Sequence, residues 1–437
     1  MARHQQNVLW DVVDESFDEA EFLWRTWESS LDTHARNYRQ VWFWTEDRLH
    51  GALDGVRLGG PRAAEELLLP ALLRPHQSGS FMVAAHVLAA DPRGWDAFVP
   101  HLMAANAQTT PLLARALQTQ LPNAAVQARL ATLGEPGVPW LVGMRTFAKQ
   151  QSSQEHVAML ANSPHAEHRR LAMAAARLQP VSVARGWIER GLFDIDAQVC
   201  SAAVESGLVH GLRSAWARCL ELGVAQSSAV SLFWMASLAG ERERRLLLAA
   251  LGQERTFNVA LQAMGFLGTK EAAQACLQAM HSPPHARLAA EGFCAITGLE
   301  LAAQNLALPE PAALNDPLSF ELDDMNADLV PKLDDLLPLP DVEGVNRWWS
   351  NNEGRFDANE RYIGGQALSS AALWQALATG PMRRRHVLAF ELAVRTAGAC
   401  DLQTRAFFQA QKRQLAQIQQ HLVNDAAGFI LHQPLRA

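Results

Sequence analysis

A short apolar segment recurs every 29 or 30 residues through the middle of the chain. Five successive copies end at Leu178, Leu208, Leu238, Leu267 and Ile296. Apolar or small residues also stand four and six positions before each of these ends, which places them on one stripe of an α-helix. A period of this length accommodates two short helices and two turns, and one such unit cannot bury its stripe alone. The repeat therefore predicts an all-α chain in which helical units stack in series.

Stacked helix pairs of this kind are typical of a HEAT-like α-solenoid, an α/α superhelix. The period continues backwards, less regularly, through Leu88, Leu117 and Phe147. We therefore expect about eight units, in a repeat array over residues 61–304.

Residues 1–60 differ from the array because they hold five of the 13 tryptophans. The pattern predicts a helix over residues 16–31, with Ser16 as its N-cap, and a second helix over residues 34–49. Terminal units of a solenoid must cover an exposed end of the core. We expect this segment to be an atypical aromatic N-terminal cap.

Negative charge is concentrated in one stretch near the end of the array. Residues 309–343 hold ten acids and one base, a charge of −9, whereas the whole chain carries only −7 at pH 7. The prolines in this part disfavour a long helix. We predict an acidic, proline-rich connection over residues 305–345, followed by a C-terminal helical region over residues 346–437. The helices expected in that region, which would form a C-terminal helical cap, span residues 366–379, 382–397 and 401–424.

Motifs that would indicate an enzyme are missing from the sequence. It contains no dinucleotide fingerprint, P-loop, nucleophile elbow or HExxH segment, and no CxxC pair. His165 and His168 stand three residues apart, but two ligands do not make a metal site. We predict no catalytic residue, cofactor or metal. The five scattered cysteines, the lack of an apolar span and the lack of a signal-like start favour a cytoplasmic protein.

Clusters of arginine raise the alternative of nucleic-acid binding. Arg242, Arg244 and Arg245 alternate with Glu241 and Glu243, which suits a solvated helix turn. The net charge is negative and no long basic stripe is present, so the sequence disfavours a nucleic-acid partner. A second cluster, residues 383–385, could instead pair with the acidic stretch.

The adjacent tryptophans Trp348 and Trp349 are the most distinctive pair in the chain. They precede a polar loop and the residues Arg361 and Tyr362. Two interpretations stand: the aromatic side chains anchor this segment by packing, which is the more common role, or they form a hot spot for a protein partner. The candidate partner-binding residues are Trp348, Trp349, Arg361, Tyr362, Asp323, Asp324, Asp334 and Asp335, the acids as a screen for a basic partner.

Several segments in fixed order resemble a bacterial family of HEAT-repeat proteins that are often encoded beside type VI secretion genes. They are RLHGALDG at residues 48–55 with the glycine pair at 59–60, AITG at 295–298, the Trp348-Trp349 pair, RYIGGQ at 361–366 and RHVLAFELA at 385–393. The resemblance implies a genetic context of spike proteins, toxins, chaperones and immunity proteins. It implies no catalytic residues.

We therefore expect a non-enzymatic protein-binding scaffold, a chaperone or adaptor for a type VI secretion effector or spike component. One alternative is an immunity protein that neutralises a co-encoded toxin. A second is a HEAT-like DNA-binding or lyase-type enzyme, which would need a pocket with converging polar groups. The sequence does not specify the oligomeric state.

Overall fold

The computed structural model describes residues 8–120, 123–309, 334–424 and 428–430. Helices dominate these residues, which confirms the all-α class. Within the described ranges, strands occur only as two short antiparallel pairs: β1 (Ala307–Leu308) with β2 (Leu339–Pro340), and β3 (Tyr362–Ile363) with β4 (Gln366–Ala367). The chain divides into two compact units. The described parts of Met1–Trp216 and Ala378–Gly428 form unit 1, and those of Ala217–Leu377 and Phe429–Arg436 form unit 2.

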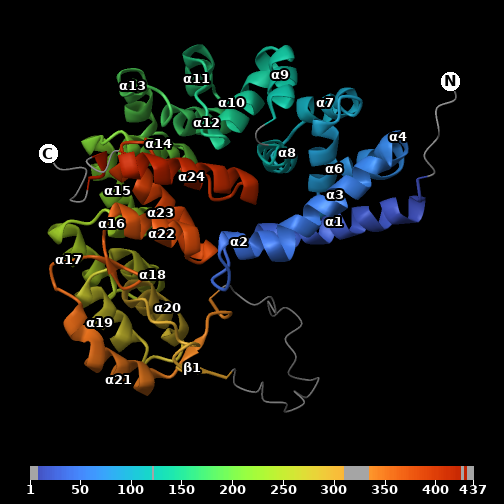
Figure 1. Ribbon diagram of the computed structural model, residues 1–437. Coiled ribbons are helices and arrows are strands. Elements are labelled where there is room, and N and C mark those ends of the chain that lie inside the picture. The colour runs from blue at the N-terminus through green and yellow to red at the C-terminus, as the bar shows by residue number, and fades with distance from the viewer. Residues whose placement is uncertain (1–7, 121–122, 310–333, 425–427, 431–437) are drawn as a thin grey trace, which may run out of the picture. The chain divides into compact units, whose positions relative to one another are not determined.

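Unit 1 is built from helices that pack on their second neighbour along the chain. Helices α6, α8, α10, α12 and α14 pack in series, while α9, α11 and α13 pack on α10, α12 and α14 respectively (Figure 1). The helices and helical turns up to α14 are α1 (Trp10–Ser30), α2 (Tyr38–Val41), the π-helical turn η1 (Trp42–Glu46), α3 (Asp47–Leu58), α4 (Gly60–Ala63), η2 (Ala64–Leu68), α5 (Leu69–Leu72), α6 (Ser78–Ala90), α7 (Trp95–Met103), α8 (Thr109–Gln118), α9 (Ala124–Thr132), η3 (Glu135–Gly137), α10 (Val138–Phe147), α11 (Gln154–Ala161), α12 (Ala166–Ala176), α13 (Val181–Gly191) and α14 (Ala197–Val209).

Two further helices of unit 1 come from the C-terminal part of the chain, α23 (Met382–Arg395) and α24 (Phe408–Asn424). Helices α15 (Arg213–Gln226) and α22 (Ser370–Thr379) span the two divisions between the units.

Unit 2 repeats the same packing, with α16, α18 and α20 in series. Its elements are α16 (Ala229–Ser237), α17 (Glu241–Ala250), α18 (Phe257–Leu267), α19 (Lys270–Ala279), α20 (Ala286–Thr297), the β1–β2 pair, α21 (Val342–Asn352), η5 (Glu353–Arg355) and the β3–β4 pair.

The repeat period of the sequence corresponds to alternate helices. Its five central copies fall on α12, α14, α16, α18 and α20, and Leu208, Leu238, Leu267 and Ile296 are buried. Small residues keep the helices close: a Cβ atom on Gly191 of α13 would lie 2.9 Å from the Cβ of Ala203 on α14. Burial of one stripe per helix pair is therefore the main packing rule in both units.

A segment of turns and bends joins α23 to α24 and crosses the ends of the inner helices of unit 1. We call residues 396–407 the C-terminal strap. Going along it, the strap meets α14, α12, α10 and α8 in that order, opposite to their order in the chain. The contacts are Gly398 with Val209, Asp401 with Arg177, Gln403 with Phe147, and the Arg405 carbonyl with Arg115. The strap thus binds arginine side chains of α8 and of the end of α12, and one backbone carbonyl at the end of α10 that has no partner within its helix.

The strap ends in an aromatic cluster that includes N-terminal tryptophans. Phe407 lies with its ring centroid 4.4 Å from that of Trp27 and 6.3 Å from that of Trp24. Glu46, only 2% exposed, accepts hydrogen bonds from Trp27 Nε1 and from the backbone N–H of Phe408. The N-terminal segment and the C-terminal helices therefore share one core.

Helix boundaries differ from the sequence expectation at several points. Helix α1 begins at Trp10, so Ser16 lies inside it and donates its hydroxyl to Val12 O instead of capping the helix. The second helix begins at Tyr38, where Asn37 is the cap, and runs through the π-helical turn to Leu58.

Three C-terminal expectations are also wrong in part. Residues 366–369 form β4 and a turn, so the helix expected from residue 366 begins at Ser370. The helix expected from residue 401 begins at Phe408, because the strap precedes it. The connection expected at 305–345 is not wholly irregular, since β1 and β2 pair and α21 begins at Val342. Most of the acidic stretch lies outside the described residues.

Acid is expected to weaken the attachment of the strap through Asp32. This carboxylate accepts both Arg405 Nη2 (2.7 and 3.1 Å) and His386 Nε2 (3.1 Å). Burial raises the pKa of Asp32, but the hydrogen bonds and charges of His386 and Arg405 outweigh it and lower the pKa to about 2. The unfolded value is about 3.9. The stabilisation is therefore present above pH ~4 and is lost as the pH falls towards ~2.

Melting temperatures of the protein and of Asp32→Asn between pH 2 and pH 7 measure this linkage. The difference in melting temperature between the protein and Asp32→Asn should be constant above pH ~4 and should become smaller below it. Asp54→Asn, which removes an exposed carboxylate paired with Arg57, reports the effect of a surface charge alone. A gap that does not change with pH would contradict the assignment.

Candidate functional site: a groove along α8, α10 and α12

A groove in unit 1 runs across the exposed faces of three consecutive inner helices. Its volume is about 1290 Å³. Residues spaced three or four apart on α8, α10 and α12 line it, because each helix turns the face opposite its buried stripe in this direction. The lining includes residues 110, 111 and 114 of α8, 139, 140, 143 and 144 of α10, and 167, 168, 170 and 171 of α12.

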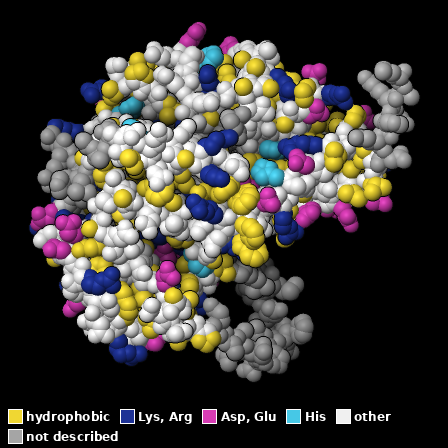
Figure 2. Space-filling model, viewed as in Figure 1, with side chains coloured by type: hydrophobic (Ala, Val, Ile, Leu, Met, Phe, Trp, Pro, Cys, Tyr) yellow, Lys and Arg dark blue, Asp and Glu magenta, His cyan; other side chains and the backbone are white. Residues whose placement is uncertain are grey.

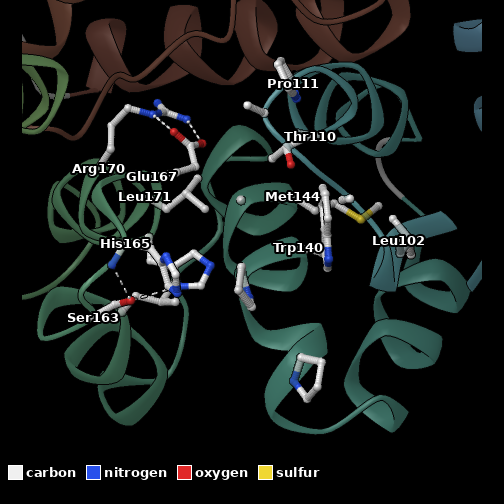
Figure 3. Close-up of a pocket in the computed structure, with 18 of the residues that line it drawn as sticks. Leu102, Thr110, Pro111, Trp140, Met144, Ser163, His165, Glu167, Arg170 and Leu171 are labelled. Carbon is white, nitrogen blue, oxygen red and sulfur yellow. Dashed lines mark hydrogen bonds and ion pairs between the residues drawn. The ribbon is translucent and has the colours of Figure 1, made fainter. Parts of the chain in front are cut away.

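The floor of the groove is apolar. Trp140 is half-buried and Met144 is buried, and both project from α10 between α8 and α12 (Figure 3). Gly143 lies between them, and a Cβ atom there would meet only Leu171 Cδ2, at 3.4 Å. The missing side chain leaves the centre of the floor open. This combination of an aromatic ring, a thioether and a gap is suited to an apolar side chain of a ligand.

Charged groups at the walls balance one another. Arg170 and Glu167 pair on α12 at 2.7 Å, and both are substantially exposed (Figure 3). Arg115 binds Glu28 at 2.6 Å and also donates to the Arg405 carbonyl of the strap. With Glu135 as the fourth charged lining residue, the groove carries two charges of each sign. Its field therefore attracts neither polyanions nor polycations.

A serine and two histidines stand at one end of the groove. Ser163 Oγ lies 3.1 Å from His168 Nδ1, and the rings of His165 and His168 are 5.2 Å apart. Burial, and then the neighbouring His165, lower the pKa of His168. Ser163 Oγ also accepts the backbone N–H of His165, which is the geometry of a turn. Among the described residues, no carboxylate is hydrogen-bonded to the imidazole of His168, so the arrangement favours a local structural role over acyl transfer.

Two general findings concern the whole described chain. Among the described residues, no three or more His, Cys, Asp and Glu side chains are grouped so that they could hold a metal ion. Within the same residues, no helix is both long enough and apolar enough to cross a membrane.

The paired tryptophans lie in unit 2, on α21. Trp349 is 5% exposed, and its ring centroid lies 5.4 Å from those of Phe293 and of Phe356. Trp348 is half-buried, 6.0 Å from Phe293. The contacts of Trp349 are those of a core residue, and they support the packing interpretation for it. Trp348 retains accessible surface.

Arg361 and Tyr362 cap the end of the inner helix α18 of unit 2. Arg361 donates to the carbonyl of Phe266 at 2.8 Å, and the N–H of Tyr362 donates to the carbonyl of Gly268 at 2.7 Å. The next residues, 364 and 365, donate to carbonyls at the end of α20. Gly268 has φ +71°, and a Cβ there would collide with Tyr362 O, so only glycine fits. Residues 361–365 are thus fixed by hydrogen bonds to backbone carbonyls at the ends of helices.

The remaining candidates divide between described and undescribed residues. Asp334 is half-buried, with Gln262 Nε2 3.4 Å from its Oδ2, and Asp335 is exposed. Asp323 and Asp324 lie outside the described residues.

In the arginine cluster at 383–385, Arg385 is fully buried and donates to Gln411 Oε1 at 2.6 Å. Burial lowers its pKa to about 10.

No family model, no curated protein and no solved structure matches this chain in the comparisons made. The function therefore has to be argued from the geometry.

The sequence interpretation missed Trp140 and Met144, although their i, i+4 spacing around Gly143 was visible. It missed them because the same spacing also describes a buried stripe.

Proposed function

We propose that the chain is a non-enzymatic protein-binding scaffold, and that the groove along α8, α10 and α12 holds an apolar segment of its partner. The observation that carries this proposal is the apolar floor, where Trp140 keeps accessible surface beside the gap at Gly143, with Met144 buried beneath. Tryptophan is among the residues most often found at the energetic centre of protein interfaces. The balanced charge of the walls supports a protein partner over a nucleic acid.

The architecture proposed with this function is a HEAT-like α-solenoid. Two features support it: the period of 29 or 30 residues, and the series packing of alternate helices within each unit. Solenoids present extended surfaces made of successive repeats, and the groove is such a surface.

We propose a secretion effector or spike component as the partner, with the chain acting as a cytoplasmic chaperone or adaptor. The support is the resemblance of the sequence segments to the HEAT-repeat family encoded beside type VI secretion genes. An immunity protein that binds a toxin is the alternative within the same binding class. Deletion in the native host separates them: loss of an adaptor stops secretion, whereas loss of an immunity protein makes cells sensitive to their siblings.

A DNA-binding or lyase-type enzyme is the alternative from a different class. Such an enzyme needs an electropositive pocket with a group that can act as acid or base. The groove offers two charges of each sign and a serine–histidine pair without an orienting acid. The geometry therefore supports this alternative less well.

Substitutions in the groove test the site directly. The partner is first identified by affinity purification from the native host, and its affinity for variants is then measured by calorimetry. Trp140→Ala should weaken binding about 30-fold, in the range of an interface hot spot. Gly143→Leu, which fills the gap in the floor, should weaken it comparably.

Two matched controls accompany these variants. Gly143→Ala adds a methyl group at ordinary contact distance and should keep binding while stabilising α10 by about 0.5–1 kcal/mol. Phe193→Ala removes an aromatic ring that is 75% exposed and does not line the groove. If Trp140→Ala and Gly143→Leu both bind the partner as tightly as the unaltered protein, the groove is not the binding site.

A further inference from the structure

A second, smaller pocket lies elsewhere in unit 1, between α2, η1 and α24. Its volume is about 560 Å³. Figure 2 shows cationic side chains beside hydrophobic ones on the face where α24 and α2 lie in Figure 1. The lining residues are Asn37, Tyr38, Arg39, Gln40, Trp42, Phe43, Phe408 and Lys412.

The back of the pocket is a rigid stack of rings. The Arg385 guanidinium carbon lies 4.7 Å from the Tyr38 ring centroid, Tyr38 stacks on Phe408 at 5.3 Å, and Phe408 stacks on Trp42 at 4.8 Å. Glu46 fixes the start of α24 by accepting the N–H of Phe408. Trp42, the last ring of the stack, is half-buried and lines the pocket. A ligand would therefore meet an aromatic surface that needs no rearrangement.

The polar lining offers hydrogen-bond donors almost exclusively. The side-chain oxygens of Asn37 and Gln40 are already used, because each accepts backbone N–H groups in a capping box. Their amide nitrogens have no partner among the described residues. Arg39 and Lys412 are exposed and form no ion pair with any described acid, and no carboxylate lines the pocket. Such a lining complements an anion.

Two exposed aromatic side chains extend this surface: Phe43 lines the pocket, and Trp44 lies next to it. Phe43 is 64% exposed and Trp44 is 58% exposed, and their rings stand edge to face at 5.3 Å. The π-helical turn that contains them directs Thr45 and Glu46 inward and leaves these two rings outward. A mononucleotide held in the pocket would leave Trp44 uncovered, whereas an extended peptide could cover both rings.

We propose that this pocket binds an acidic peptide segment of a protein partner that carries an aromatic side chain. The aromatic side chain stacks on Trp42 and Phe43, and flanking carboxylates accept from Arg39, which comes from α2, and Lys412, which comes from α24. This site is separate from the groove along α8, α10 and α12, and it does not depend on the function proposed for that groove.

Calorimetry with defined probes tests the proposal on the full-length protein. The probes are a capped heptapeptide with one tryptophan flanked by aspartate and glutamate, the same peptide with alanine in place of tryptophan, the lysine-flanked counterpart, and adenosine monophosphate. We expect the acidic tryptophan peptide to bind at least about tenfold more tightly than the other three probes. Its affinity should fall as salt is raised from 50 to 300 mM, because the contributing charges are exposed.

Substitutions of exposed residues assign the contacts without disturbing the stack. Arg39→Gln and Lys412→Gln should each weaken binding of the acidic tryptophan peptide about threefold, as for exposed ion pairs, and the double variant about tenfold. Phe43→Ser should weaken it by about fivefold, in the range of one aromatic contact. Arg93→Gln removes an exposed cation that does not line the pocket and should change nothing.

Three results would overturn the proposal. The lysine-flanked peptide could bind as tightly as the acidic one, or the double variant could keep full affinity. In either case the cations do not select the ligand. If adenosine monophosphate binds as tightly as the acidic peptide, the pocket is a site for small aromatic anions and not for a peptide.

Discussion

Replacing Asp401 with alanine is expected to destabilise unit 1 by about 3–5 kcal/mol, the range measured when one partner of a buried ion pair is removed. The Asp401 side chain is 8% exposed and binds Lys149 at 2.9 Å and Arg177 at 2.6 Å. Its removal leaves two largely buried cations without this carboxylate. Native-state hydrogen exchange of the amides in α10 and α12 measures the loss.

Glu205→Gln is the matched control, because Glu205 also pairs with Arg177 but is 39% exposed. Its removal should cost no more than about 1 kcal/mol. Equal losses in the two variants would contradict the assignment of Asp401 as the main anchor of the strap.

Acidification should also destabilise unit 1, by removing part of the stability that Asp401 contributes. Burial raises the pKa of Asp401, but Arg177 and Lys149 outweigh it and hold the pKa below its ordinary value. A lowered carboxyl pKa contributes stability above the unfolded value of about 3.9, and that contribution disappears as the pH falls through the folded value. Asp401→Asn should therefore lose less stability on acidification than the unaltered protein.

The second large effect is expected in unit 2, where Trp349→Ala should cost about 3–5 kcal/mol. Trp349 packs on Phe293 of α20 and on Phe356, so its removal opens a cavity between α20 and α21. Trp348→Ala should cost clearly less, since Trp348 is only half-buried. Hydrogen exchange of α20 and α21 distinguishes the two variants.

This pair of variants also separates the two interpretations of the tryptophans. If Trp349→Ala leaves α20 and α21 protected but abolishes binding of an identified partner, Trp349 is a contact residue and not an anchor. A stability loss at Trp349, together with a binding loss at Trp348, would assign one role to each ring.

The period in the sequence predicted which helices alternate, because burial of one stripe per unit leaves a local and repeated trace. Leu208, Leu238 and Leu267 were placed correctly in the core for this reason. The C-terminal strap left no such trace. Its residues are compatible with a helix, and Asp401 meets Arg177, which stands 224 residues earlier in the chain. Long-range contacts of this kind help to hold the segment in its turns and bends instead of a helix.

The two pockets were hidden from the sequence for different physical reasons. Trp140 and Met144 have the spacing of a buried stripe, and only the packing of α8 and α12 shows that their face is open. The smaller pocket depends on the π-helical turn, which adds a residue to the helix and turns Phe43 and Trp44 outward. Among the residues predicted for partner binding, burial of Trp349 and Tyr362 follows from contacts with Phe356, which the sequence did not indicate.

The position of the strap has a consequence for synthesis on the ribosome. Unit 1 is discontinuous in the chain, since unit 2 is encoded between its two parts. At about 5–20 residues per second, the 224 residues that separate Arg177 from Asp401 take roughly 10–45 s to translate. During that interval the Ala217–Leu377 part of unit 2 is translated, while α8, α10 and α12 have already been made. Asp401, and after it α24, can therefore join the older part of unit 1 only once that part of unit 2 has been made.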